Sequence, residues 1–253
     1  MSFTVAAAAY DRFMGRYSAP LAPVFADFAR VDGGRVLDVG CGPGALTTEL
    51  VARAGAEAVT AVDPSEPFVA AVRERLPGVD VHRAAAEALP FDDASFDAAL
   101  AQLVVHFMPD PVAGLREMAR VTRGDGTIAA CVWDHAGGTG PLGLFWTAAR
   151  ELDPRVEDES DLPGAAEGHL LALFEEAGLR DVEGALLHVE VEHSSFDEWW
   201  DPFTLGVGPA GAYVAGLDAA AQARLRDRCR ALLPKEPFRL AAAAWAARGS
   251  PRD

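Results

Sequence analysis

The chain has 253 residues, of which 50% are hydrophobic and 24% charged, a balance typical of a folded globular protein and unlike that of a disordered one. Acidic residues outnumber basic ones by 38 to 22, and the formal net charge of -16 disfavours nucleic acid and anionic membrane surfaces as partners. The three cysteines lie far apart and form no CxxC pair or Cys/His cluster, so the sequence predicts neither a disulfide framework nor a metal site.

The amino-terminal part of the chain predicts a helix. Residues 19–30 carry apolar side chains at helical spacing, and an Asp-Gly-Gly turn at residues 32–34 ends the pattern. The alanine run at residues 6–9 has no basic flank, and no apolar stretch is long enough to span a bilayer. We therefore expect a cytoplasmic protein without membrane insertion.

Residues 35–133 alternate between strand-like and helix-like segments. This alternation indicates an α/β fold with a parallel sheet that is covered by helices on both faces. The predicted strands are residues 35–39, 58–62, 79–82, 96–102 and 127–133; the predicted helices are residues 45–54, 65–76 and 111–121; and a turn is predicted at residues 123–126.

The rhythm changes after Trp133. Residues 134–141 are rich in glycine and residues 151–159 are acidic and poor in apolar side chains, which predicts a surface excursion. The alanines of the last apolar run suit a helix as well as a strand, and we assign the run to a strand. The elements predicted here are a helix at residues 167–177, an edge strand at 185–193, helical pieces within 195–233 and a last strand at 238–247.

Residues 36–44 read Val-Leu-Asp-Val-Gly-Cys-Gly-Pro-Gly, a strand that ends in a turn with glycine at alternate positions. Glycine lets a ligand approach the main chain, and the following helix directs free N–H groups towards the same cleft. A dinucleotide fingerprint needs G-x-G-x-x-G, whereas the spacing here is G-x-G-x-G. Asp38, at the end of the strand, would oppose a pyrophosphate. The loop therefore favours a ligand with sulfonium and ammonium groups.

Asp63 closes the second predicted strand, where this architecture places a carboxylate for ribose hydroxyls. Both carboxylate oxygens can accept hydrogen bonds from such a ligand. The alternative role for Asp63 is to cap the helix that follows Pro64. If the first reading holds, Gly42 and Asp63 face one hollow at the tips of two neighbouring strands.

Four ordered blocks carry a family resemblance: residues 36–44, 61–65 (AVDPS), 86–97 (AEALPFDDASFD) and 107–111 (FMPDP). Over roughly residues 10–133, the chain resembles the class I S-adenosylmethionine-dependent methyltransferases, which include the ubiquinone and menaquinone biosynthesis enzymes. The resemblance implies a Rossmann-like, mostly parallel seven-stranded sheet and S-adenosylmethionine as the cofactor. The expected single domain, residues 1–253, comprises a helical lid at 1–30, a cofactor-binding core at 31–134, an insertion at 135–165 and a helical cap at 195–235 before the last strand.

The resemblance also implies how the cofactor lies. The glycines of the loop would face its methionine part, Asp63 its ribose and the main chain at residues 86–87 its adenine, while Gln102 would approach the sulfonium. The family often carries Asp just before the Ala-Glu pair, and Ala85 stands there in this chain, which implies weaker or water-mediated adenine contact. The cofactor-site candidates are Asp38, Gly40, Gly42, Gly44, Asp63, Pro64, Ala86, Glu87, Gln102, Arg16 and Tyr17.

Arg16 and Tyr17 are candidates because residues 10–17 are similar to segments that fold over the cofactor in relatives. Either side chain would hold the cofactor carboxylate or shield the methyl group from water. The alternative is an ordinary docking helix that uses its aromatic side chains as apolar anchors.

Methyl transfer from a sulfonium is an in-line displacement, so alignment and the exclusion of water matter most. A proton acceptor is needed only when the nucleophile arrives protonated. His106 and His135 follow the fourth and fifth predicted strands, at the sheet edge where ligands bind in open α/β folds, and are the catalytic candidates. Asp134 is a third candidate, and loop histidines satisfied by their neighbours are the alternative.

Aromatic side chains concentrate in the second half of the chain and suit an apolar pocket for a carbon-rich substrate. The alternatives are the core of a lid or a contact in a homodimer. The substrate-pocket candidates are Tyr10, Trp133, Trp146, Trp199 and Trp200.

The sequence therefore predicts an enzyme that methylates a small, apolar or aromatic metabolite at O, C or N. A non-catalytic cofactor-binding protein or partner subunit of the same fold is the alternative, and Ala85 is the residue that favours it. A nicotinamide-dependent oxidoreductase would require a different glycine spacing.

Overall fold

The computed structural model describes residues 7–252, so the part of the expected lid formed by residues 1–6 lies outside the described residues. Seven strands form one sheet in the order β3-β2-β1-β4-β5-β7-β6. Strands β1 to β5 pair in parallel, and β7 pairs antiparallel with both β5 and β6. The predicted α/β class and the mostly parallel seven-stranded sheet are confirmed.

The central strands are short and apolar because both faces of the sheet are covered. All residues of β1 and β2 are buried, and β-branched valines dominate them. The strands are β1 (Val36–Val39), β2 (Val59–Asp63), β3 (Asp80–Arg83), β4 (Phe96–Gln102), β5 (Thr122–Trp133), β6 (Arg180–His193) and β7 (Phe238–Ser250).

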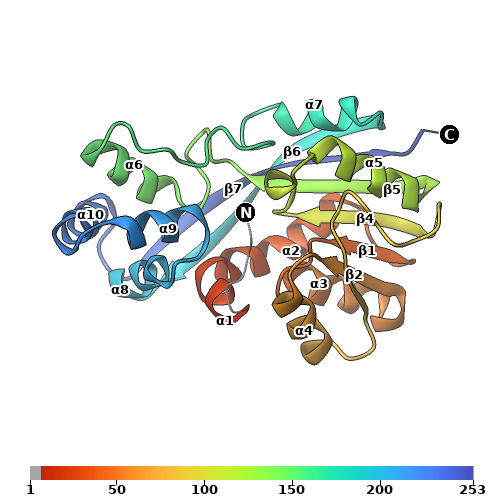
Figure 1. Ribbon diagram of the computed structural model, residues 1–253, viewed down its shortest axis with the longest axis horizontal. Helices are drawn as coiled ribbons and strands as arrows, with labels where there is room; N and C mark the ends of the chain where they lie inside the picture. Colours follow the sequence, from red (N-terminus) through yellow and green to blue (C-terminus); the bar gives the residue numbers. More distant parts are fainter. Residues whose placement is uncertain (1–6, 253) are drawn as a thin grey trace.

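Helices cover the two faces unequally (Figure 1). Helices α2 (Arg16–Phe28), α3 (Ala45–Ala54) and α4 (Glu66–Arg75) pack on one face. Helices α5 (Pro111–Val121) and α7 (His169–Glu176) pack on the other. Each helix buries one apolar stripe against the sheet, which is the main source of its stability.

A helical cap gathers at one end of the sheet, at the left of Figure 1. It consists of α6 (Gly143–Leu152) and of four pieces between β6 and β7: α8 (Phe196–Trp200), η4 (Asp201–Leu205), α9 (Gly208–Gly216) and α10 (Ala219–Leu232). The cap has its own core of buried aromatic side chains, which is separate from the two layers that cover the sheet.

The amino-terminal segment joins the cap to the sheet. Helix α1 (Ala7–Tyr10), the π-helical turn η1 (Asp11–Gly15) and α2 follow one another without a break. Phe13 and Met14 of η1 pack into the cap core, whereas Leu21 and Phe25 of α2 pack on the sheet. The short turns η2 (Ala56–Ala58) and η3 (Val105–Phe107) complete the structure. Within the described residues, no helix combines the length and the apolar character needed to cross a membrane.

Two predictions from the sequence need correction, and a third, the strand at the last apolar run, is confirmed. The predicted turn at residues 123–126 lies inside β5, where Thr122 pairs with Phe96 but Thr127 pairs with Ala98, so the residues between them form a bulge. The predicted surface excursion contains helix α6, four of whose side chains are buried. The last apolar run is a strand, because β5 and β6 flank its alanines on both sides.

Candidate functional site

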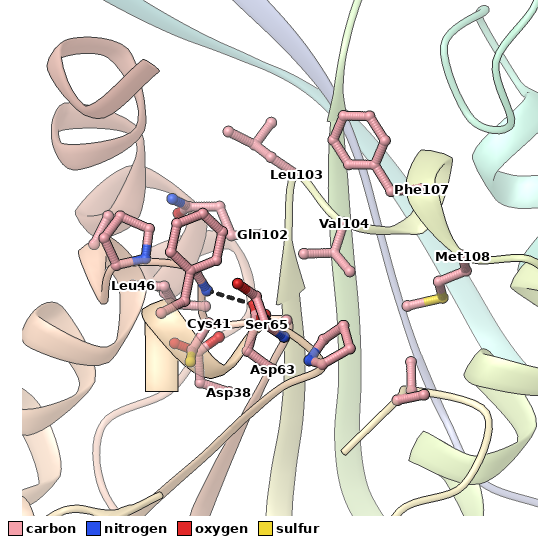
Figure 2. Close-up of a pocket in the computed structure, with 18 of the residues that line it drawn as sticks. Asp38, Cys41, Leu46, Asp63, Ser65, Gln102, Leu103, Val104, Phe107 and Met108 are labelled. Carbon is pink, nitrogen blue, oxygen red and sulfur yellow. Dashed lines mark hydrogen bonds between the residues drawn. The ribbon is translucent and has the colours of Figure 1, made fainter. Parts of the chain in front are cut away.

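A hollow of about 400 Å³ opens at the carboxyl ends of β1, β2 and β4 (Figure 2). This edge of an open α/β sheet, where the strand order reverses, is the usual place for a ligand. Eight of the eleven cofactor-site candidates line it: Asp38, Gly40, Gly42, Asp63, Pro64, Ala86, Glu87 and Gln102.

The glycine loop has backbone conformations with positive φ, which residues with a Cβ atom rarely adopt. Gly40, Gly42 and Gly44 have φ values of 71°, 52° and 97°. Gly40 donates its N–H to the carbonyl of Val62 at 2.8 Å, which ties the loop to the end of β2. A Cβ atom on Gly42 would have no atom within 4 Å, so this glycine faces open space.

Asp63 connects the two strand tips. Its Oδ2 accepts the N–H of Gly42 at 2.9 Å, and its Oδ1 accepts the N–H of Ser65 at 2.8 Å. Burial raises the pKa of Asp63, and these two hydrogen bonds counteract the increase. The carboxylate therefore lies in the same hollow as Gly42, with one oxygen towards the loop and the other at the start of α4.

Asp38 is buried at the base of the hollow beside Asp63 (Figure 2). Its Oδ2 accepts a hydrogen bond from the hydroxyl of Thr47 at 2.6 Å. Burial raises the pKa of Asp38 to about 7; the bond from Thr47 opposes the increase, and the nearby Asp63 adds to it. A bound cation would favour the ionised form of this carboxyl group.

The side-chain amide of Gln102 presents an unused acceptor. Its Nε2 donates to the carbonyl of Ser18 at 3.0 Å, which fixes the orientation of the amide because a carbonyl oxygen can only accept. Among residues 7–252, the buried Oε1 atom has no hydrogen-bond partner. A buried acceptor without a partner is costly, so the site is suited to a ligand that brings a donor.

The far wall of the hollow is apolar. Ala85, Ala86, Val104 and Met108 line it, and Glu87 is fixed near its rim because its carboxylate accepts the N–H of Asp110 at 3.3 Å. Ala85 offers no side-chain acceptor there, so a flat ring would be held by apolar contact and by main-chain groups.

The chemistry of the lining fits S-adenosylmethionine better than a nucleotide phosphate. Three carboxyl groups, from Asp38, Asp63 and Glu87, line the hollow, and none of the described residues around it is Lys, Arg or His. Negative charge without a cation repels phosphate and attracts sulfonium and ammonium groups. Within residues 7–252, His, Cys, Asp and Glu side chains form no group of three that could hold a metal ion.

A second, smaller cavity of about 30 Å³ adjoins the hollow and shares Tyr10, Leu103 and Phe107 with it. The catalytic candidates His106 and His135 both line this cavity, with ring centroids 5.9 Å apart. Burial lowers the pKa of His135 to about 4 and that of His106 well below its usual range. Both imidazoles are therefore neutral at pH 7.

Asp134, the third candidate, does not line either cavity. Its carboxylate accepts hydrogen bonds from the N–H of Gly137, the hydroxyl of Thr139 and the indole of Trp245. The group fixes the loop after β5 to β7, which is a structural role.

Three other cofactor-site candidates do not line the hollow. A Cβ atom on Gly44 would point at Val72 of α4, 3.2 Å away. Arg16 donates to Nδ1 of the buried His193 at 2.8 Å and forms an ion pair with Glu198. Because Arg16 can only donate, His193 carries its proton on Nε2, which donates to the hydroxyl of Tyr17 at 3.0 Å. Through these bonds, Arg16 and Tyr17 link α2 to β6 and to the cap.

The aromatic candidates divide between the cavities and the cap core. Tyr10 lines both cavities and Trp133 lines the smaller one. Trp146, Trp199 and Trp200 are buried in the cap core, where contacts with other aromatic rings surround them. The cap-core alternative therefore describes these three side chains better than the substrate pocket does.

Sequence reasoning missed Glu159, which lines the smaller cavity. Its Oε2 accepts the indole N–H of Trp146 at 2.8 Å, and its side chain is buried. The acidic composition of its segment indicated a solvated loop, and only the tertiary fold distinguishes this carboxyl group from its exposed neighbours.

Comparisons with known proteins give the same picture. The family profile described as "Methyltransferase domain" matches residues 37–130. The chain is 30% identical over 200 residues to a "Probable S-adenosylmethionine-dependent methyltransferase" of Mycobacterium tuberculosis, covering 76% of this chain and 72% of that protein. It is 38% identical over 168 residues to an uncharacterized methyltransferase of the same organism and spans 65% of its length.

A solved structure shares the fold. The YcgJ protein of Bacillus subtilis superimposes with a TM-score of 0.58 at 19% identity, over 92% of this chain and 98% of that one. At this identity the likeness concerns the architecture of the sheet and its helices.

Proposed function

The chain belongs to the S-adenosylmethionine-dependent methyltransferase family, and we propose that it transfers the cofactor's methyl group to a small, apolar or aromatic metabolite. The observation that carries the proposal is the hollow where β1 and β2 end, in which Gly42 and Asp63 meet over the buried carboxyl group of Asp38.

Each part of the hollow has a task in this proposal. Asp38 and the Oε1 atom of Gln102 hold the ammonium and sulfonium end, Asp63 accepts from the ribose hydroxyls, and the wall at residues 85–87 contacts the adenine. Gly40 and Gly42 let the main chain approach the ligand. When bound, the sulfonium supplies an electrophilic methyl carbon, and the surrounding side chains align the acceptor and exclude water.

The acceptor is proposed to bind where the two cavities meet. Tyr10, Leu103 and Phe107 form the shared wall and Trp133 the inner wall of the smaller cavity, which suits an apolar or aromatic compound. The net charge of -16 argues against nucleic acid as the acceptor. Because burial lowers their pKa values, His106 and His135 are weak bases, and they are proposed to hold the acceptor by hydrogen bonds rather than to remove its proton.

Calorimetry with S-adenosylmethionine, followed by detection of S-adenosylhomocysteine with a panel of phenols, hydroquinones and amines, tests the proposal. Binding with turnover is expected. Binding without turnover across the panel would favour the non-catalytic alternative, and absence of binding would remove the cofactor role of the hollow.

Asp63→Ala is expected to weaken cofactor affinity by about 1–3 kcal/mol, because ribose hydroxyls lose a buried partner. Calorimetric Kd values for the wild type and the variant measure the effect. Asp92→Ala is the control and should leave the Kd unchanged. Its carboxylate is exposed and precedes the amino end of β4, whereas the hollow lies at the carboxyl ends of the strands. A Kd for Asp63→Ala equal to that of the control would exclude Asp63 from the site.

Cofactor affinity is expected to rise between pH of about 5.5 and about 8, because binding of a cation favours the ionised form of Asp38. Burial holds the pKa of Asp38 at about 7 in the free protein, so below that pH binding must release a proton. Calorimetry over this range measures the slope. Asp38→Asn should bind more weakly with a flatter pH dependence, and an equal slope in both proteins would contradict the assignment.

A further inference from the structure

The smaller cavity has the composition of a site for one particular chemical group. Its volume of about 30 Å³ is enough for roughly two waters, and therefore for the reactive end of an acceptor rather than the whole compound. The rest of the acceptor would lie against Leu103 and Phe107, which line both cavities and are labelled in the upper part of Figure 2.

Three of the residues that line this cavity each carry a buried polar atom that has no hydrogen-bond partner among the described residues. The atoms are Nδ1 of His106, Nε2 of His135 and Nε1 of Trp133. Trp133 can only donate, whereas each neutral imidazole nitrogen donates or accepts according to its tautomer. Buried groups of this kind require a partner, and a hydroxyl group both donates and accepts.

The charge of the cavity excludes an anionic acceptor group. None of the described residues that line it is Lys or Arg, and both imidazoles are neutral. A carboxylate or phosphate placed here would be desolvated beside Glu159 without any compensating cation. An ammonium group offers no acceptor to the indole N–H of Trp133, which can only donate. An uncharged hydroxyl remains.

Glu159 is held in position to act on that hydroxyl. Trp146 donates to its Oε2 at 2.8 Å, and the neighbouring Asp158 is anchored separately by an ion pair with Arg150. The titratable groups that face Glu159 are Tyr10 from the amino-terminal segment, His106 and His135 from the loops after β4 and β5, and Asp158.

We propose that the smaller cavity binds the hydroxyl end of an uncharged aromatic acceptor and that the carboxylate of Glu159 takes the hydroxyl proton. The inference rests on the proposed function, since the larger hollow must supply the methyl donor. As the acceptor oxygen bonds to the methyl carbon, the carbon–sulfur bond breaks, its electron pair stays on sulfur, and the proton passes to Glu159.

The alternatives for proton removal are weaker. Burial raises the pKa of Glu159 to about 7, to which Asp158 contributes, and a proton acceptor works best when its pKa lies near the working pH. Burial lowers the pKa of His135 to about 4, which makes it a poor base. Asp134 is occupied by three hydrogen bonds.

Three probes that differ only at the reactive end test the binding part: 4-ethylphenol, 4-ethylbenzoate and 4-ethylbenzylamine. Calorimetry with the full chain saturated with S-adenosylhomocysteine at pH 7 is expected to show binding of 4-ethylphenol, with the two charged probes at least tenfold weaker. Equal or tighter binding of either charged probe, or no binding of 4-ethylphenol, would overturn the proposal.

Glu159→Gln tests the proton acceptor and keeps an oxygen for Trp146, so the cap should stay folded. The infrared carbonyl band of protonated carboxylic acids that disappears as pH rises through about 7 has contributions from Glu159 and Asp38, so it should be weaker in the variant than in the wild type by the Glu159 part. Methyl transfer to 4-ethylphenol should fall by about 10²–10⁴-fold. Glu157→Gln, two residues away and exposed, is the matched control and should behave as the wild type.

The role of Glu159 and the proposed methyltransferase function can be contradicted by different results. If Glu159→Gln keeps the wild-type rate or the full intensity of the infrared band, the role of Glu159 is wrong while the cofactor site stands. If the wild type does not bind S-adenosylmethionine, the proposed function itself is wrong. An unchanged Kd for the cofactor in Glu159→Gln is therefore part of the expected result.

Discussion

Gly40→Ala is expected to lower the free energy of unfolding by about 2–4 kcal/mol and to abolish measurable cofactor binding. A Cβ atom at this position would lie 2.5 Å from both Cγ atoms of Val104, and the residue has a φ of 71°. The loop could relieve the overlap only by leaving the hydrogen bond to Val62 that fixes it over the hollow. Urea unfolding and calorimetry measure the two effects.

Gly55→Ala separates the overlap from the backbone strain. Gly55 has a similar φ of 84°, but a Cβ atom there would meet no atom within 4 Å. It should lose only about 1–2 kcal/mol and keep cofactor affinity. Adding Val104→Ala to Gly40→Ala should restore part of the lost stability, and equal losses in Gly40→Ala and Gly55→Ala would show that the contact with Val104 is unimportant.

Phe145→Ala should cost about 3–5 kcal/mol of unfolding free energy, because it empties the centre of the cap core. Phe145 is fully buried and stacks on Phe203 with ring centroids 4.5 Å apart and planes within 7°. Its edge also meets Trp146 at 4.9 Å. Urea unfolding followed by tryptophan fluorescence measures the loss.

Leu152→Ala, at the end of the same helix, is the control for Phe145→Ala. Leu152 is 45% exposed and should change stability by less than about 0.5 kcal/mol. Cofactor affinity should survive in Phe145→Ala at temperatures where the protein is folded, since Phe145 does not line the larger hollow. A loss under 1 kcal/mol would show that the cap repacks freely.

The cofactor half of the molecule was predictable because its signals are local. The glycine loop, the carboxylate at the end of β2 and the alternation of strands and helices all lie within short stretches of sequence, and parallel pairing brings strand ends to one edge. Helices α3 and α5 begin and end at the predicted residues.

The region proposed to bind the acceptor was less predictable, because contacts between residues far apart in the sequence define it. Helix α6 begins at Gly143 after Leu142, which provides no side-chain cap, so no start signal marks it in the sequence. Glu159 resembles any solvated acid until the cap covers it. For Arg16 and Tyr17, the sequence offered a contact with the cofactor or an ordinary docking helix. It could not show that His193, 176 residues beyond Tyr17, forms hydrogen bonds with both side chains.

The part of the cap that lies between β6 and β7 leaves and rejoins the sheet at His193 and Phe238, which are paired neighbours on these two strands. A segment whose two ends are so close can be lengthened, shortened or exchanged while every strand stays in register. Exchange of the 194–237 segment, by natural variation or by grafting from a relative, would replace Val207, Gly208 and Pro209 of the smaller cavity and leave every residue that lines the larger hollow in place.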